Sequence, residues 1–273
     1  MSGHVEARKA MSKIGRLAAA GVEECIQALK DEDHLVREEA AFQLGRRGDR
    51  AAIAFLLQCL EDREEKVRWR VLQALARLGP QEASTQIQAM VHDASPRVRG
   101  EAAMALGRIG HADLIPSLVP LLDDGSPEVR WKALEAIAEI GVAEESEMEK
   151  VLRCLEDQEA SVRMHAARAA GACRYLPAVG PLIERLVDPK HTVRWFAAWA
   201  LGQLGDEKAL GPLINSLADG DEYVRIYVYQ ALEEFGARAA KALTDALAHP
   251  DPTVTRFAGM LLDGISRDAE TGG

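Results

Sequence analysis

The chain has 273 residues, of which 48% are hydrophobic and 5% aromatic, and a formal net charge of −10. Residues 1–110 contain 17 Lys and Arg against 16 Asp and Glu, whereas residues 111–273 contain 16 against 27. Nucleic-acid affinity depends on contacts between cations and phosphates, so this balance disfavours a nucleic-acid partner, above all in the C-terminal two-thirds.

We expect no secretion signal in the N-terminal segment. Its apolar stretch, residues 14–22, is short and is interrupted by Gly15 and Arg16. No apolar run of the chain reaches the length that a bilayer-spanning helix needs. We therefore expect a cytoplasmic protein that does not associate with a membrane.

A valine recurs eight times along the chain at nearly constant spacing. Successive intervals are 31, 31, 31, 33, 31, 31 and 30 residues, and the last valine, Val254, precedes Thr255. The other seven precede Arg: Val36, Val67, Val98, Val129, Val162, Val193 and Val224. A fixed period of this size predicts a stack of similar helical units.

Residues 111–141 show one unit clearly. Leucines and isoleucines at helical spacing over residues 114–122 predict a first helix, called helix A. Residues 123–127 form a turn, in which Ser126 can cap a second helix, helix B, with Pro127 at its first position. Gly141 ends helix B, where a left-handed residue is needed. Neither helix can bury its apolar face without neighbouring units.

An aspartate stands five residues before the valine in seven of the eight units, and His249 takes its place in the last. These residues are Asp31, Asp62, Asp93, Asp124, Asp157, Asp188 and Asp219. We expect the aspartates and the arginines to form a ladder of side-chain bonds that links turn to helix and unit to unit. An enzyme needs one site, so the repetition argues against acid–base catalysis.

The recurring Asp, Val-Arg, Ala four residues after Val and closing Gly resemble HEAT repeats. The 31-residue form is similar to the HEAT-like repeats of phycobilin lyases and of many bacterial and archaeal scaffold proteins. The resemblance implies an all-α, right-handed α-solenoid of about eight helix pairs, with B helices lining a concave groove. Residues 3–15 align with a helix B and predict an N-terminal half-repeat cap. We expect a single solenoid over residues 1–266 and a disordered tail over 267–273.

Two irregularities fall near mid-chain. The 33-residue interval places two additional residues in an expected acidic loop, Val142 to Glu149. The following unit has Arg174 where the closing Gly is usual. The two irregularities can reflect a tolerated insertion. Alternatively, they change the curvature of the stack and place a loop at the edge of a partner.

Positions 0, 4, 7, 8 and 11, counted from each valine, are apolar and predict the core. Positions 2, 3, 6 and 10 vary and are expected to face outward into the groove, so they supply the predicted partner-binding residues. These are Trp69, Trp131, Met164, Trp195, Phe196, Trp199, Ile226, Tyr227, Arg70, Arg77 and Arg108. We expect the aromatic and apolar residues of units six to eight to cluster: Trp195, Phe196, Trp199, Ile226, Tyr227 and Phe257. Exposed aromatic patches usually mark interaction sites. The alternative is that each Trp covers an Ala-rich seam between helices.

The sequence contains no phosphate-binding loop, nucleophile elbow or metal-ligand spacing, and its four cysteines predict small buried thiols. We therefore expect no catalytic residue, metal or cofactor. The favoured function is a non-enzymatic, monomeric scaffold that binds a protein segment. The alternatives are a phycobilin lyase-like protein that holds a bilin and its apoprotein, and a nucleic-acid enzyme like the alkylpurine glycosylases. Trp131 and Glu135 resemble the glycosylase pairing, but those enzymes need a basic groove.

Overall fold

The computed structural model describes residues 2–79, 81–141 and 144–271, with side chains for residues 8–79, 81, 83–141 and 144–267. The regular elements of these residues are all helical. The chain divides into two compact units, Met1–Ile140 and Gly141–Gly273, here called the N-terminal and C-terminal units.

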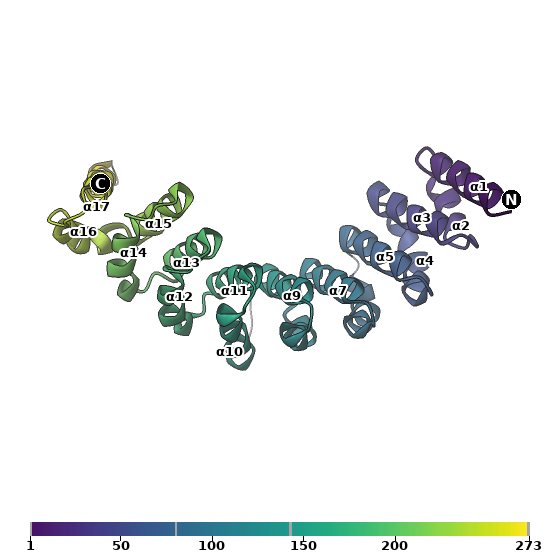
Figure 1. Cartoon of the computed structure of the whole chain (residues 1–273), viewed down its shortest axis with the longest axis horizontal. Helices are drawn as coiled ribbons and strands as arrows, with labels where there is room; N and C mark the ends of the chain where they lie inside the picture. The colour runs from purple at the N-terminus through teal and green to yellow at the C-terminus, as the bar shows by residue number, and fades with distance from the viewer. Residues whose placement is uncertain (1, 80, 142–143, 272–273) are drawn as a thin grey trace. The chain divides into compact units, whose positions relative to one another are not determined.

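Each unit is a stack of helix pairs in which the long helix corresponds to helix B (Figure 1). The long helices of the N-terminal unit are α1 (Ser2–Leu17), α3 (His34–Arg47), α5 (Glu65–Leu78), α7 (Pro96–Ile109) and α9 (Pro127–Ile140). Those of the C-terminal unit are α11 (Ala160–Ala172), α13 (His191–Leu204), α15 (Glu222–Phe235) and α17 (Pro252–Thr271). Consecutive long helices within a unit pack side by side, and the predicted α-solenoid class is confirmed.

The short helices, which correspond to helix A, form the second layer of each unit. They are α2 (Val22–Ala28), α4 (Ile53–Gln58), α6 (Ser84–Ala89), α8 (Ile115–Leu118), α10 (Glu145–Arg153), α12 (Val179–Arg185), α14 (Leu210–Ser216) and α16 (Ala240–Ala246). No helix in the described residues is long and apolar enough to cross a bilayer.

Tighter 3₁₀ turns flank most short helices. They are η1 (Arg50–Ala52), η2 (Cys59–Glu61), η3 (Gln81–Ala83), η4 (Met90–His92), η5 (Ala112–Leu114), η6 (Val119–Asp123), η7 (Cys154–Glu156), η8 (Leu176–Ala178), η9 (Glu207–Ala209) and η10 (Gly236–Ala239). The first helix predicted over residues 114–122 is present as η5, α8 and η6, which follow one another without a break. Only α8 is α-helical there, and Pro120 lacks the N–H that would continue its hydrogen-bond pattern.

The core includes the predicted positions 0 and 4, whereas position 11 is less buried than predicted: Arg47 is exposed, and Ile140, Cys173 and Leu204 are half-buried. The eight recurring valines are 0–1% exposed. The residues four positions later are fully buried: Ala40, Val71, Ala102, Ala133, Ala166, Ala197, Val228 and Ala258. Gly141 has a φ of 75°, which confirms the predicted left-handed helix end. Arg174, which replaces such a glycine, also has a positive φ of 50°.

The Asp–Arg ladder is present, and its carboxylates belong to the following helix pair. Arg68 Nε and Nη2 donate to the two carboxylate oxygens of Asp93 at 2.7 and 2.9 Å. Arg68 Nη1 also donates to the backbone oxygen of Asp62 at 2.8 Å. The same side-chain pairing joins Arg37 to Asp62, Arg99 to Asp124, Arg163 to Asp188 and Arg194 to Asp219. Each of these arginines therefore links two consecutive pairs.

Other side chains take over this role at the ends of the stack. In the half-repeat α1, Lys13 Nζ lies 2.6 Å from Asp31 Oδ2. In the last pair, Thr255 Oγ1 donates to the backbone oxygen of His249 at 3.1 Å, as Arg does elsewhere. The predicted cap is thus α1, which packs on α3. Helix α17 extends to Thr271, and Gly272 and Gly273 of the predicted tail lie outside the described residues. The boundaries predicted for the solenoid and tail stay predictions.

The expected acidic loop over residues 142–149 is helical in its second half. Helix α10 begins at Glu145, and the Glu147 carboxylate accepts a hydrogen bond from the Glu144 N–H at 2.7 Å. Carboxylates in a first turn stabilise a helix because they satisfy its free N–H groups and complement its dipole. The loop prediction was wrong for this part, and Val142 and Ala143 lie outside the described residues.

Candidate functional site

Small residues bring the long helices of the C-terminal unit close together. A Cβ built on Gly202 of α13 would lie 2.8 Å from the Ala231 Cα of α15, closer than real atoms approach. The same seam recurs between Gly171 of α11 and Ala200 of α13. The Trp199 ring lies against the second seam, because its Cζ3 would be 2.9 Å from a Cβ on Gly171.

The outer face of α13 and α15 carries a continuous aromatic cluster, which we define as His191, Trp195, Phe196, Trp199, Tyr223 and Tyr227. The Trp195 ring centroid lies 5.7 Å from that of Phe196, 5.9 Å from Tyr223 and 5.2 Å from Tyr227. His191 and Trp199 extend the cluster through edge contacts with Trp195 and Phe196. Four of the predicted binding residues are thereby brought together: Trp195, Phe196, Trp199 and Tyr227.

Tyr223 and His191 were missed by the sequence analysis. Each precedes its valine, by one and by two residues, and positions before the valine were not counted as outward-facing. Tyr223 is 61% exposed, more than any aromatic residue singled out from the sequence. A helical projection that included these two positions would have found both.

The aromatic cluster has exposed apolar surface and one hydrogen-bond donor without an acceptor. Ile226, beside it on α15, is 43% exposed, whereas Trp195, Phe196, Trp199 and Tyr227 are half-buried. Trp195 Nε1 is buried and has no hydrogen-bond partner. A buried donor left without an acceptor costs about 1–3 kcal/mol.

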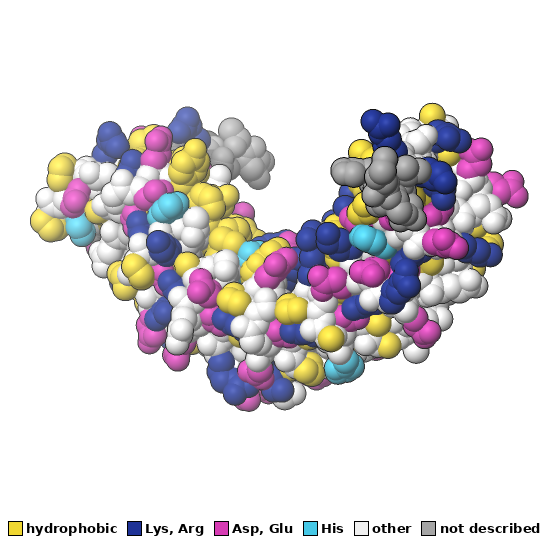
Figure 2. Space-filling model, turned by 45° about the vertical axis from the view of Figure 1, so that its right-hand side comes forward, with side chains coloured by type: hydrophobic (Ala, Val, Ile, Leu, Met, Phe, Trp, Pro, Cys, Tyr) yellow, Lys and Arg dark blue, Asp and Glu magenta, His cyan; other side chains and the backbone are white. Residues whose placement is uncertain are grey.

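A cleft of about 520 Å³ adjoins the aromatic cluster between α13 and α15. The α13–α15 cleft is lined by Trp199, Gly202, Gln203, Tyr227, Gln230, Ala231, Glu233 and Glu234. Trp199 and Tyr227 therefore belong to both the cluster and the cleft. Figure 2 shows hydrophobic side chains gathered along the upper right edge of the C-terminal unit, which lies on the left of the view.

Trp69 in the N-terminal unit departs from its predicted outward-facing role. Its side chain is only 5% exposed, because the guanidinium groups of Arg70 and Arg97 lie 4.1 and 3.7 Å from its ring centroid. Arg70 is itself bound to Glu38 at 3.2 Å. Arg97 belongs to the next helix pair, so the sequence of one unit did not show that Trp69 would be covered.

The remaining predicted residues are not members of the aromatic cluster. Trp131 of α9 and Met164 of α11 are half-buried, and Lys132 Nζ lies 5.7 Å from the Trp131 ring centroid. Lys132 was expected to face outward, yet it is 7% exposed because its stem crosses Gly100 to reach Glu101. Arg77 and Arg108 are exposed on α5 and α7.

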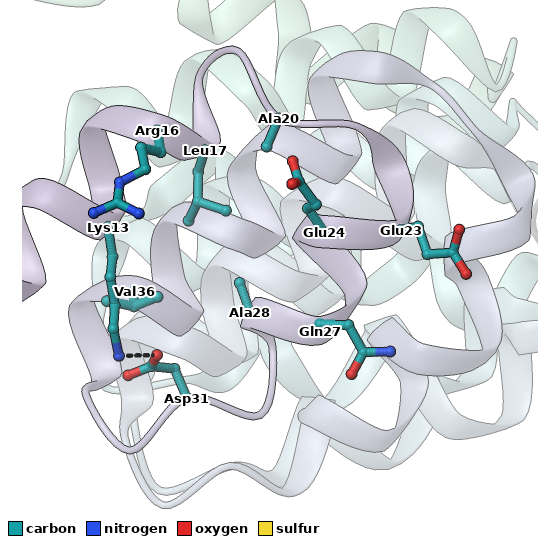
Figure 3. Close-up of a pocket in the computed structure, with 10 residues that line it drawn as sticks. All are labelled: Lys13, Arg16, Leu17, Ala20, Glu23, Glu24, Gln27, Ala28, Asp31 and Val36. Carbon is teal, nitrogen blue, oxygen red and sulfur yellow. Dashed lines mark hydrogen bonds and ion pairs between the residues drawn. The ribbon is translucent and has the colours of Figure 1, made fainter.

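A second cavity, of about 330 Å³, lies between α1 and α2 at the N-terminal cap (Figure 3). Leu17, Ala20, Ala28 and Val36 supply its apolar lining, and Lys13 reaches Asp31 across one side. Short helices of successive pairs are neighbours in this unit, as the Gln88–Ser117 hydrogen bond shows. The half-repeat α1 has no short helix of its own, so we attribute this cavity to the end of the stack.

The burial and the pKa values of the cysteines fit a structural role. Cys25 and Cys154 are buried and Cys59 and Cys173 are half-buried. Burial raises the pKa of the Cys173 thiol to about 11 and also raises the pKa values of Cys25 and Cys59. These thiols are therefore protonated at neutral pH and weakly nucleophilic. Among the residues that the structure describes, no three His, Cys, Asp or Glu side chains are grouped to hold a metal.

The paired helices, close small-residue seams and pair-to-pair ladder define a helical-repeat protein of the α-solenoid class. The sequence profile of the HEAT repeats matches residues 22–92, 84–170 and 148–222. The chain belongs to the HEAT repeat family, as its repeating motif predicts. No protein among those with curated descriptions matches it.

Several solved structures share the fold. YibA of Escherichia coli is 21% identical, with 93% of this chain and 97% of that chain covered and a TM-score of 0.64. The complex of CpcE and CpcF of phycocyanin lyase from Nostoc sp. PCC7120 is 24% identical, with 90% and 95% covered and a TM-score of 0.55. An engineered protein is 22% identical, with 90% and 78% covered and a TM-score of 0.57. At these identities the likeness supports the fold alone.

Proposed function

We propose that this protein is a non-enzymatic interaction scaffold that binds a segment of a partner protein on the aromatic cluster. The observation that supports it most strongly is the clustering of six aromatic side chains on two adjacent long helices, with Tyr223 61% exposed. Trp and Tyr are the residues that most often dominate protein–protein binding energy. HEAT repeats present such faces on a rigid stack, which lowers the entropic cost of binding.

A bilin-binding function, like that named for the phycocyanin lyase neighbour, fits the α13–α15 cleft less well. A linear tetrapyrrole carries two propionates, which favour cationic partners. The cleft lining contains Glu233 and Glu234 and has no Lys or Arg. An absorbance shift on mixing the protein with a bilin, abolished by Trp195→Ala, would favour the lyase-like function over the scaffold.

The test is selection of binders from a random peptide library displayed on phage, followed by titration of the enriched peptides. We expect Trp195→Ala and Tyr227→Ala each to weaken peptide binding by about 2 kcal/mol, near thirtyfold. Ile226→Ala should also weaken binding. Leu247→Ala is its matched control, because Leu247 is 44% exposed at the end of α16 and Ile226 is 43% exposed. Equal binding by all four variants would contradict the proposed site.

A further inference from the structure

We propose that the α13–α15 cleft holds a lysine or arginine side chain of the bound segment. This inference rests on the proposed scaffold function and names the chemistry of its partner, a segment with a basic residue beside apolar ones. The apolar residues would cover the aromatic cluster while the cation enters the cleft.

The walls of the cleft suit a cation. Trp199 and Tyr227 line it, and the face of either ring attracts an ammonium or guanidinium group placed within about 6 Å of its centroid. The same chemistry operates elsewhere in this chain, where the guanidinium groups of Arg70 and Arg97 lie over the Trp69 ring. At Trp69 the chain supplies its own cations, whereas no residue lining the α13–α15 cleft is cationic.

The charge of the cleft is negative and is not neutralised by internal ion pairs. Glu233 and Glu234 are exposed, and no hydrogen bond or ion pair of the described residues engages their carboxylates. Burial and the Glu233 charge raise the pKa of nearby Tyr229, although the Arg267 charge acts in the opposite direction. The surroundings add to this field, since residues 141–273 contain 14 Lys and Arg against 21 Asp and Glu.

Glu233 occupies a position that the fold does not require to be acidic. The ninth residue after the valine is glycine in four other long helices: Gly45, Gly107, Gly171 and Gly202. Those glycines permit close helix packing against the next pair, and a carboxylate contributes nothing to such a seam. Gln203 and Gln230 add side-chain oxygens that can accept hydrogen bonds from a cation. The equivalent residue is Gly or Ala in six other long helices and Asp263 in α17, so the fold does not require an acidic residue at this position.

The experiment uses the full-length protein and the same random peptide library. We expect the enriched peptides to contain Lys or Arg next to apolar residues, and replacement of that residue by norleucine to weaken binding at least about fivefold. Glu233→Gln combined with Glu234→Gln should weaken binding by a similar factor. Its matched control is Glu207→Gln combined with Asp245→Asn, which removes two exposed charges from η9 and α16.

The outcomes separate this inference from the proposed function. In one outcome, the enriched peptides require Trp195 and Tyr227 but contain no enriched basic residue, and they bind the Glu233/Glu234 variant normally. That result would be consistent with the scaffold proposal and would overturn the cation site. Equal weakening by the control pair would also overturn it, because the effect would then come from net charge. A failure to enrich any peptide would overturn both proposals.

Discussion

Several side chains of this repeat have a role that is set by a contact with the next helix pair. Arg163 is the clearest case, because it donates to both carboxylate oxygens of Asp188 at 2.8 and 2.9 Å. The Asp188 side chain is only 2% exposed. The sequence could predict this ladder because its members recur at fixed positions. It could not predict the burial of Trp69 and Lys132, which depends on the stems of particular neighbours.

We expect Arg163→Ala to lower the free energy of unfolding by about 3 kcal/mol, because it leaves a buried carboxylate without its charged partner. Arg108→Ala, at an exposed position on α7, should change it by no more than about 0.5 kcal/mol. Urea denaturation of both variants measures the difference. Coincident midpoints would contradict a stabilising role for the ladder.

Arg174 offers a prediction of the opposite sign. It ends α11 in a Schellman arrangement, in which the Tyr175 N–H donates to the Ala170 oxygen at 3.1 Å, and its φ is 50°. A non-glycine residue is sterically strained in this conformation. Arg174→Gly should therefore raise the free energy of unfolding by about 1 kcal/mol, measured by thermal unfolding. Arg174→Ala keeps the strain and should give no such gain.

At the scale of helices, the sequence predicted the long elements better than the short ones. The recurring Val, Ala and closing Gly determine where each long helix begins, which face it buries and where it ends. The short helices tighten into 3₁₀ turns, which hydrophobic spacing alone does not reveal. The small-residue seams were also missed, although the recurring glycine nine residues after Val was a usable signal.

The seams predict that one substitution has opposite effects at two glycines of the N-terminal unit. A Cβ on Gly45 would lie 2.6 Å from the Ala74 Cα of α5, so Gly45→Ala forces α3 and α5 apart. We expect it to destabilise the protein by about 1–3 kcal/mol. Gly15 of α1 has no atom within 4 Å of the equivalent position, and Gly15→Ala should stabilise α1 by up to about 1 kcal/mol. Denaturation midpoints that move in the same direction would contradict the seam.

At the scale of the molecule, the repeat distributes stability over contacts between neighbouring pairs instead of one central core. It also leaves the outer face free to vary, which is why the fold was predictable and the partner was not. The aromatic residues of the candidate site were visible in the sequence. Their clustering was predicted as well, but not the part that Tyr223 and His191 take in it, because these two residues precede the recurring valines.

The repeated ladder should make the whole molecule sensitive to acid. Burial alone would raise the pKa of Asp93, but hydrogen bonds from Arg68 and the Ser95 N–H, with the Arg68 charge, outweigh it and lower the pKa. The same balance lowers the pKa values of Asp62, Asp124, Asp188 and Asp219. A carboxyl group whose pKa is lower in the folded chain binds fewer protons there than in the unfolded chain.

The stabilisation by these carboxylates is therefore complete above the unfolded value of about 3.9 and is lost as the pH falls through the lower folded values. Urea unfolding followed from neutral pH downward should show stability falling steeply below about pH 4, because five such groups act together. Asp93→Asn removes one titrating group from the ladder and should make this fall shallower, although the variant starts less stable. Asp113→Asn, at an exposed position on η5, is the matched control and should keep the wild-type slope. An unchanged slope in Asp93→Asn would place the acid sensitivity outside the ladder.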